Sequence, residues 1–154
     1  MEKNIPLTSD ENLMLAMNSI GVYLSARDHS LKELNDKLVK KYPPETVNMA
    51  LEKAVSYGWI VSPKELAEKT AQMLNRKYKG FRYIRQYLKS KGLPPTERNE
   101  EIEVEKACHL INKHFYNNDE EIKLSYKDKQ KAYRILSNRG FDHQTIKTVT
   151  YEIY

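Results

Sequence analysis

Three segments of this chain repeat one pattern of apolar residues at helical spacing, and this repetition limits which folds the chain can adopt. Leu38, Leu88 and Leu136 occupy the same position of the pattern, 50 and 48 residues apart. Each leucine follows a second apolar residue by four positions and precedes a basic residue and a turn. A unit of about 50 residues holds three short helices, which cannot bury an apolar face alone, so neighbouring units must stack.

Capping residues and glycines divide the remaining sequence into helices. Four hydroxyl–acid pairs have capping-box spacing, and three glycines fall where helices should end. No segment alternates apolar and polar residues for more than a few positions, so we expect no β-sheet. The N-cap residues are Thr8, Ser30, Ser62 and Ser125, and the glycines are Gly58, Gly92 and Gly140.

These marks predict an all-α fold of about nine helices. We expect three tandem three-helix repeats stacked into an elongated, curved solenoid of right-handed type. The predicted division is a flexible N-terminus over 1–10, then repeats over 11–60, 61–101 and 102–154, which together form one continuous repeat domain. Residues 96–101 lack an apolar anchor, so this part of the middle repeat is predicted to be a loop or a frayed helix.

Charge is unevenly distributed along the chain, whose net charge is +5. Residues 27–95 carry 15 basic and 7 acidic residues, whereas residues 96–125 carry 4 and 8. The segment from Arg76 to Lys91 holds seven cations and no acid. Like charges so close together on a helix repel one another, which favours a partner that supplies negative charge. Three interpretations stay open: a solvated helix face, a phosphate-binding surface, and a surface for an acidic protein. The acidic block from Glu97 to Glu121 is expected to be solvated or to face a neighbour's basic stripe.

No residue pattern in the sequence organises catalysis or metal binding. There is no Gly-rich phosphate loop, and His109 and His114 are too far apart around a helix to share a metal. Cys108 is expected to be a buried small hydrophobic residue, and His29 and His143 to be surface residues at helix ends. No apolar stretch approaches the ~18 residues of a membrane span, and no signal peptide is evident. We therefore expect a cytoplasmic protein that is not an enzyme, with no cofactor, no metal and no membrane partner.

Several motifs resemble those of the RecX family, regulators of the RecA recombinase. The opening motif is Leu24-x-x-Arg27-Asp28-His29-Ser30-x-x-Glu33-Leu34. Next come Gly58-Trp59-Ile60, then Lys77-Tyr78-Lys79-Gly80, then Lys91-Gly92-Leu93, and finally Leu136-x-x-Arg139-Gly140-Phe141. The resemblance spans roughly residues 16–153. Two positions depart from the family pattern: Ser62 stands where an Asp is usual, and Phe81 where a Pro or small residue is common.

The resemblance implies a regulator that binds the RecA filament on single-stranded DNA, with indirect or weak direct DNA contact, and we expect the protein to be a monomer. It would inhibit ATP hydrolysis and strand exchange, and so regulate DNA repair, recombination and the SOS response. The alternatives are a stand-alone DNA-binding helical-repeat protein and an adaptor for an acidic protein partner. The predicted contact residues are Arg76, Lys77, Lys79, Arg82, Arg85, Lys89 and Lys91, with Arg27 and Arg139 as weaker candidates.

Overall fold

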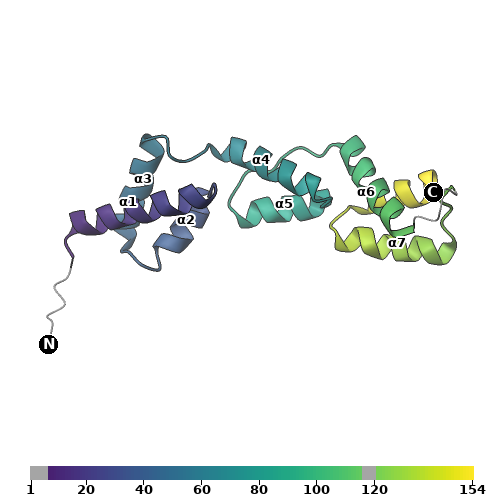
Figure 1. The fold of residues 1–154 in the computed structure, drawn as a ribbon, viewed down its shortest axis with the longest axis horizontal. Coiled ribbons are helices and arrows are strands. Elements are labelled where there is room, and N and C mark those ends of the chain that lie inside the picture. Colours follow the sequence, from purple (N-terminus) through teal and green to yellow (C-terminus); the bar gives the residue numbers. More distant parts are fainter. Residues whose placement is uncertain (1–6, 116–120) are drawn as a thin grey trace, which may run out of the picture. The chain divides into compact units, whose positions relative to one another are not determined.

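The computed structural model describes residues 7–115 and 121–154, and the secondary-structure elements of these residues are all helices, with no strand (Figure 1). This confirms the predicted all-α repeat fold. Residues 1–6 of the predicted flexible N-terminus lie outside the described residues, and α1 begins at Ser9. The described helices are α1 (Ser9–Ala26), α2 (Leu31–Leu38), α3 (Pro44–Ser56), α4 (Pro63–Arg76), α5 (Phe81–Ser90), α6 (Glu100–Phe115), α7 (Tyr126–Asn138), α8 (His143–Lys147) and the π-helix η1 (Thr148–Ile153).

The repeated leucines hold the same structural position in three helices. Leu38, Leu88 and Leu136 end the apolar faces of α2, α5 and α7, and all three are almost completely buried. The apolar residues one turn earlier, Leu34, Ile84 and Ala132, are buried as well. The sequence pattern thus identified the core-facing stripe of each of these helices correctly.

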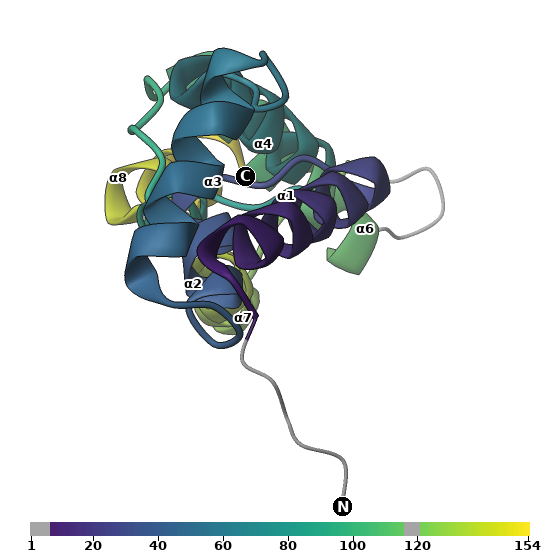
Figure 2. The same cartoon turned by 90° about the vertical axis from the view of Figure 1, so that its left-hand side faces the viewer.

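The first of two compact units contains the residues up to Leu66 together with Lys91–Leu93. Here α1, α2 and α3 pack against one another, and Figures 1 and 2 both show α1 lying against α3. Their shared core is formed by seven buried residues: Ala16, Ile20, Leu34, Leu38, Val47, Ala50 and Ala54.

The second unit contains Ala67–Ser90 and Pro94–Tyr154. Its core lies among α6, α7, α8 and η1, and the fully buried Phe141 is its largest side chain. Arg98 ties the loop before α6 to the start of α8, because its Nε donates to Asp142 Oδ2 over 2.7 Å and its Nη2 to Thr145 Oγ1 over 2.5 Å. Burial alone would raise the pKa of Asp142, but the hydrogen bonds from Thr145 and Arg98 outweigh burial and hold this pKa below its ordinary value.

The predicted helix starts are present. Thr8 and Ser30 form complete capping boxes with Glu11 and Glu33. Ser62 and Ser125 accept a hydrogen bond from the third residue of the following helix, and α4 begins at Pro63 as expected.

Residues 96–101 were predicted to form a loop or a frayed helix, and in the structure residues 96–99 form a loop and Glu100 begins α6. No helix forms between Ser90 and Glu100, so the chain is a loop until Asn99. Asn99 then caps α6, because its Oδ1 accepts a hydrogen bond from the Ile102 amide over 3.1 Å. The middle segment therefore contributes α4 and α5 and continues as a loop.

A glycine turn packs against the start of another helix in both units. In the first unit, Ser30 at the N-terminus of α2 donates its hydroxyl to the Lys91 carbonyl over 2.6 Å. In the second unit, the amide of Gly80 donates to Arg139 and the amide of Arg82 donates to Gly140, both over 2.9 Å. Gly92 and Gly140 adopt positive φ angles of 67° and 90° in these turns. The two turns occupy equivalent places in the repeated pattern.

Glu33 is the charged centre of the contact in the first unit. Its carboxylate lies 2.6 Å from Arg27 Nη2 and 3.5 Å from Lys91 Nζ, and it also caps the Ser30 amide. Burial alone would raise the pKa of Glu33, but the bonds from Arg27 and Ser30 and the charge of Lys91 outweigh it and lower that pKa to about 2.

Replacing Gly140 by alanine should destabilise the protein strongly. A Cβ there would lie 2.5 Å from Tyr83 Cβ and 2.7 Å from its amide nitrogen, on a backbone with φ of +90°. We expect a loss of about 2–4 kcal/mol in the free energy of unfolding, measured by urea denaturation. The matched control is Gly21→Ala within α1, where nothing lies within 4 Å of the added Cβ. That change should stabilise by about 0.5–1 kcal/mol. Equal effects of the two substitutions would contradict the proposed close approach at Gly140.

Acid should weaken the fold through Glu33. Because its pKa is lower in the folded state than its ordinary 4.5, its stabilising contribution is complete above pH 4.5 and disappears as the pH falls towards 2. We expect this contribution to be about 2–3 kcal/mol, and Glu33→Gln to remove it at neutral pH. Urea denaturation between pH 2 and pH 7 measures it, with Glu52→Gln at an exposed position as the control. A Glu33→Gln variant with the wild-type pH profile would show that the ion pair does not stabilise the fold.

Candidate polyanion-binding surface

Helix α5 presents three exposed cations outside its core-facing stripe. Ile84 and Leu88 are buried as predicted, whereas Arg82, Arg85 and Lys89 are exposed. Among residues 7–115 and 121–154, none of these three cations forms an ion pair. We call Arg82, Arg85 and Lys89 the α5 stripe. Its positive charge is therefore available to a partner.

Two tyrosines accompany the α5 stripe. The rings of Tyr83 and Tyr87 stack with centroids 6.3 Å apart, and Lys79 Nζ lies 4.7 Å from the Tyr83 centroid. Tyr83 also packs over Gly140, so only 38% of its surface is exposed. The tyrosines are thus partly packing residues, but Tyr83 keeps an accessible part beside the cations. Such a combination suits a nucleic acid strand.

The end of α4 and the turn that follows it carry three more of the predicted contacts. Arg76, the last residue of α4, and Lys77 are exposed, and Lys79 is half-buried. Tyr78 has a φ of 58°, unusual for a residue other than glycine, and its ring stacks on His109 with centroids 4.0 Å apart. Sequence reasoning missed this left-handed residue because no glycine marks it.

Arg139 stabilises this turn. Its guanidinium donates to the carbonyl of Tyr78 over 3.3 Å and to the carbonyl of Lys77. The side chain is half-buried, so its charge is engaged with backbone oxygens. Arg139 therefore positions the Lys77–Lys79 turn beside the α5 stripe.

A buried ion pair also fixes the start of α5. Lys106 Nζ lies 2.6 Å from Glu103 Oε1 and donates to Asn75 Oδ1 and the Lys79 carbonyl, both over 2.7 Å. Glu103 Oε2 in turn accepts from the Phe81 amide over 3.1 Å. Burial lowers the pKa of Lys106, opposed by its contact with Glu103. This network connects α4, α5 and α6 and was not predicted.

Glu103 corrects the prediction for the acidic block, which was expected to be solvated or to face a neighbour. Only 3% of Glu103 is exposed, and its carboxylate is satisfied by Lys106 on the same helix and by the Phe81 amide. The three-residue spacing of Glu103 and Lys106 in the sequence is typical of an ion pair on a helix, but the same spacing also fits an exposed pair. Residues 116–120 of the block lie outside the described residues.

The remaining candidate residues, Arg27 and Lys91, belong to the first unit. Both lie beside Glu33, so their charges are at least partly balanced there. Lys91 is half-buried, and its carbonyl accepts the Ser30 hydroxyl. Both residues stabilise the first unit through Glu33, and this role does not depend on a partner.

The prediction that His29 is a surface residue is wrong. It is 3% exposed, with Nδ1 3.0 Å from the Arg27 carbonyl and Nε2 2.7 Å from Lys37 Nζ. Burial is the main cause that lowers the pKa of His29. His143 is exposed, as predicted.

Cys108 is half-buried and packs against the core of the second unit. Burial raises the pKa of its thiol, against a hydrogen bond with Tyr154 that lowers it. A raised pKa disfavours the thiolate, which fits a packing residue, although Cys108 is half-buried and not buried as predicted.

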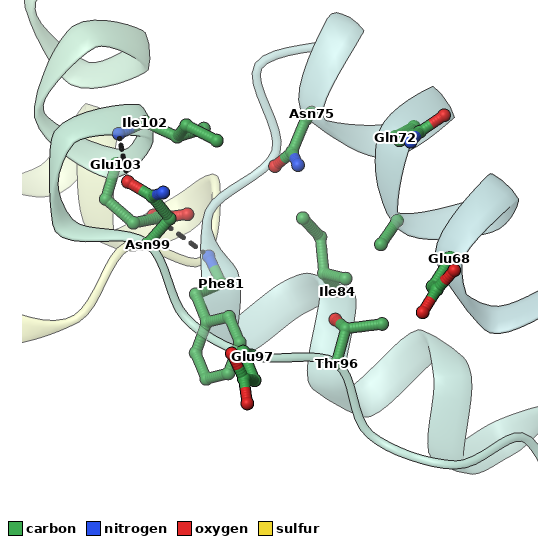
Figure 3. A pocket seen from close by; sticks show the side chains of 11 residues that line it. Glu68, Gln72, Asn75, Phe81, Ile84, Thr96, Glu97, Asn99, Ile102 and Glu103 are labelled. Carbon is green, nitrogen blue, oxygen red and sulfur yellow. Dashed lines mark hydrogen bonds between the residues drawn. The ribbon is translucent and has the colours of Figure 1, made fainter. Parts of the chain in front are cut away.

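The cavity in Figure 3 lies beside α4 and α5 and extends to the loop before α6. Its volume of about 160 Å³ is below the roughly 300–1,000 Å³ of typical small-molecule sites. Glu68, Glu97 and Glu103 contribute carboxylates, and Glu103 is already bonded to Phe81. Across the part of the chain that the structure describes, no group of three or more His, Cys, Asp or Glu could hold a metal ion. Nor does any helix of these residues have the length and apolar character to span a bilayer.

Comparison with solved structures supports the fold. A crystal structure of RecX from Lactobacillus salivarius has a TM-score of 0.74 and 23% identity, and the match covers 94% of this chain and 97% of that one. A second crystal structure, of a regulatory protein RecX, has a TM-score of 0.71 and 24% identity, with 97% and 80% covered. At 23% and 24% identity, these two matches show a shared fold alone.

Sequence comparisons show the family. Residues 16–53 match the model of the first three-helix domain of RecX, and residues 100–150 match that of the third. The regulatory protein RecX of Actinobacillus pleuropneumoniae is 30% identical over 132 residues, covering 83% of this chain and 87% of the relative. That of Legionella pneumophila is 31% identical over 137 residues, covering 84% and 89%. The chain therefore belongs to the RecX family of regulatory proteins.

Proposed function

We propose that this protein binds the RecA recombinase on single-stranded DNA and restrains its ATP hydrolysis and strand exchange. Membership of a family of regulatory proteins and the resemblance of the motifs support the choice of partner. The protein would act in the cytoplasm as a monomer, and by occupying a surface of the filament without catalysing a reaction.

The α5 stripe is the observation that carries the proposal. It combines three exposed cations without ion pairs among the described residues and the tyrosine pair beside them. A filament offers both the phosphates of DNA and protein walls. Cations that follow one helix face can approach such a surface and speed association at low salt.

The other predicted contact residues have different roles in this proposal, according to their positions in the structure. Arg76, Lys77 and Lys79 extend the α5 stripe at its N-terminal end and share its role. Arg139 supports that turn. Lys91 and Arg27 would contact the partner through the first unit.

A second candidate function, binding to DNA without a recombinase, is favoured by the same exposed cations. Direct binding to bare DNA would weaken steeply with salt, in proportion to the phosphates neutralised. Tight DNA binding together with no effect on RecA would select this function over the proposed one.

Replacing Arg82, Arg85 and Lys89 together by alanine should weaken binding to RecA–DNA filaments. Each exposed contact is expected to contribute about 0.5–1 kcal/mol, so the dissociation constant should rise roughly tenfold or more. Co-sedimentation with filaments on single-stranded DNA at moderate salt measures the change.

The matched control is the triple alanine variant of Lys40, Lys53 and Lys64, which are exposed on other helices and in a turn of the chain. It loses the same net charge, so any difference between the two variants reports the position of the charges. Equal binding by both triple variants would place the contact outside the α5 stripe.

A further inference from the structure

A groove between α7 and η1 in the second unit contains none of the residues predicted from the sequence. Tyr126, Gln130 and Tyr133 follow one another along α7 at steps of four and three, and η1 adds Tyr151. The groove has a volume of about 480 Å³. This lies within the range of sites that hold small ligands or parts of larger ones.

The aromatic side chains of the groove are unusually exposed. The exposed fraction is 74% for Tyr126, 61% for Tyr151 and 42% for Tyr133. Tyr133 is held by His143, whose Nδ1 lies 3.3 Å from its hydroxyl. The core of this unit is built on other residues of α7, such as Ala132 and Leu136, so packing does not require these rings.

The groove is also positively charged. Lys129 and Arg134 line it, and none of its lining residues is acidic. Lys129 Nζ lies 4.7 Å from the centroid of Tyr151, so a cation and an aromatic face already adjoin. Exposed rings between cations match the two chemical parts of a single strand, because bases stack on rings and phosphates pair with cations.

We propose that the groove between α7 and η1 binds single-stranded DNA, with bases on Tyr126 and Tyr151 and phosphates near Lys129 and Arg134. An acidic peptide would satisfy the cations but would leave the exposed tyrosine faces without stacked partners. The choice of DNA over RNA rests on the proposed function, in which the filament carries DNA.

Fluorescence anisotropy of a labelled 20-nucleotide oligo(dT), without recombinase, tests the groove directly. Stacking contributes about 1–3 kcal/mol per base, so Tyr126→Ala/Tyr151→Ala should weaken binding at least about tenfold. Tyr126→Phe/Tyr151→Phe keeps the rings and should bind within about twofold of the wild type. Tyr57→Ala, at a tyrosine 60% exposed in the first unit, is the control and should leave affinity unchanged.

A salt titration provides an independent test that does not depend on the tyrosine variants. Lys129→Ala/Arg134→Ala should reduce the slope of log affinity against log salt by about 0.7 for each lost cation. Two results would overturn the proposal: a double alanine variant that binds like Tyr57→Ala, or a charge variant with an unchanged slope.

Two other ligands complete the experiment. Tighter binding to polyglutamate than to oligo(dT) would overturn the proposal in favour of an acidic protein, and a preference for oligo(rU) would overturn the choice of DNA. Tyrosine-dependent binding to oligo(dT) by a protein that leaves RecA activity unchanged would support the groove while rejecting the proposed function. The two conclusions can therefore fail separately.

Discussion

The contact between a glycine turn and the N-terminus of another helix underlies the structure of both units. In the first unit the turn is Lys91–Leu93 and the helix is α2; in the second unit the turn is Arg139–Phe141 and the helix is α5. Helices of 8 to 13 residues, such as α2, α5 and α7, are barely stable alone. Hydrogen bonds to a glycine turn fix where α2 and α5 begin, and the Ser125 cap fixes where α7 begins. The buried leucine at the other end of each helix completes its attachment.

The cations of this chain serve two different physical roles. Some are used inside the fold: Arg27 and Lys91 balance Glu33, Arg98 binds Asp142, and Lys106 is buried with Glu103. The cations of the α5 stripe are outside these pairs. A high count of basic residues therefore does not by itself measure the binding surface. The proposed interface depends on the cations that the fold leaves unbalanced.

The helices and their core faces could be predicted from the sequence, because spacing and capping are local. Leu38, Leu88 and Leu136 were placed correctly, as were the caps at Thr8 and Ser30. Burial of polar groups could not be predicted in this way. Glu103 and Lys106 are buried with partners from distant segments, such as the Phe81 amide and the Lys79 carbonyl. His29 is buried by the packing of its unit, although its hydrogen-bond partners, Arg27 and Lys37, are near in the sequence.

The candidate surface was predicted only in part for the same reason. The exposed face of α5 follows from helical periodicity, whereas the use of Arg139 in holding the Lys77–Lys79 turn requires the tertiary structure. The groove between α7 and η1 was missed because Tyr126 and Tyr151 lie 25 positions apart in the sequence. Their proximity depends on how α7 and η1 pack within the second unit.

The proposal that this protein regulates by occupying a filament is tested most directly by the rate of ATP hydrolysis by RecA on single-stranded DNA. Increasing amounts of the wild-type protein should lower this rate at or below one molecule per recombinase subunit, with no ATP hydrolysis by the protein alone. A rate that stays constant across the titration, together with unchanged strand exchange, would contradict the account.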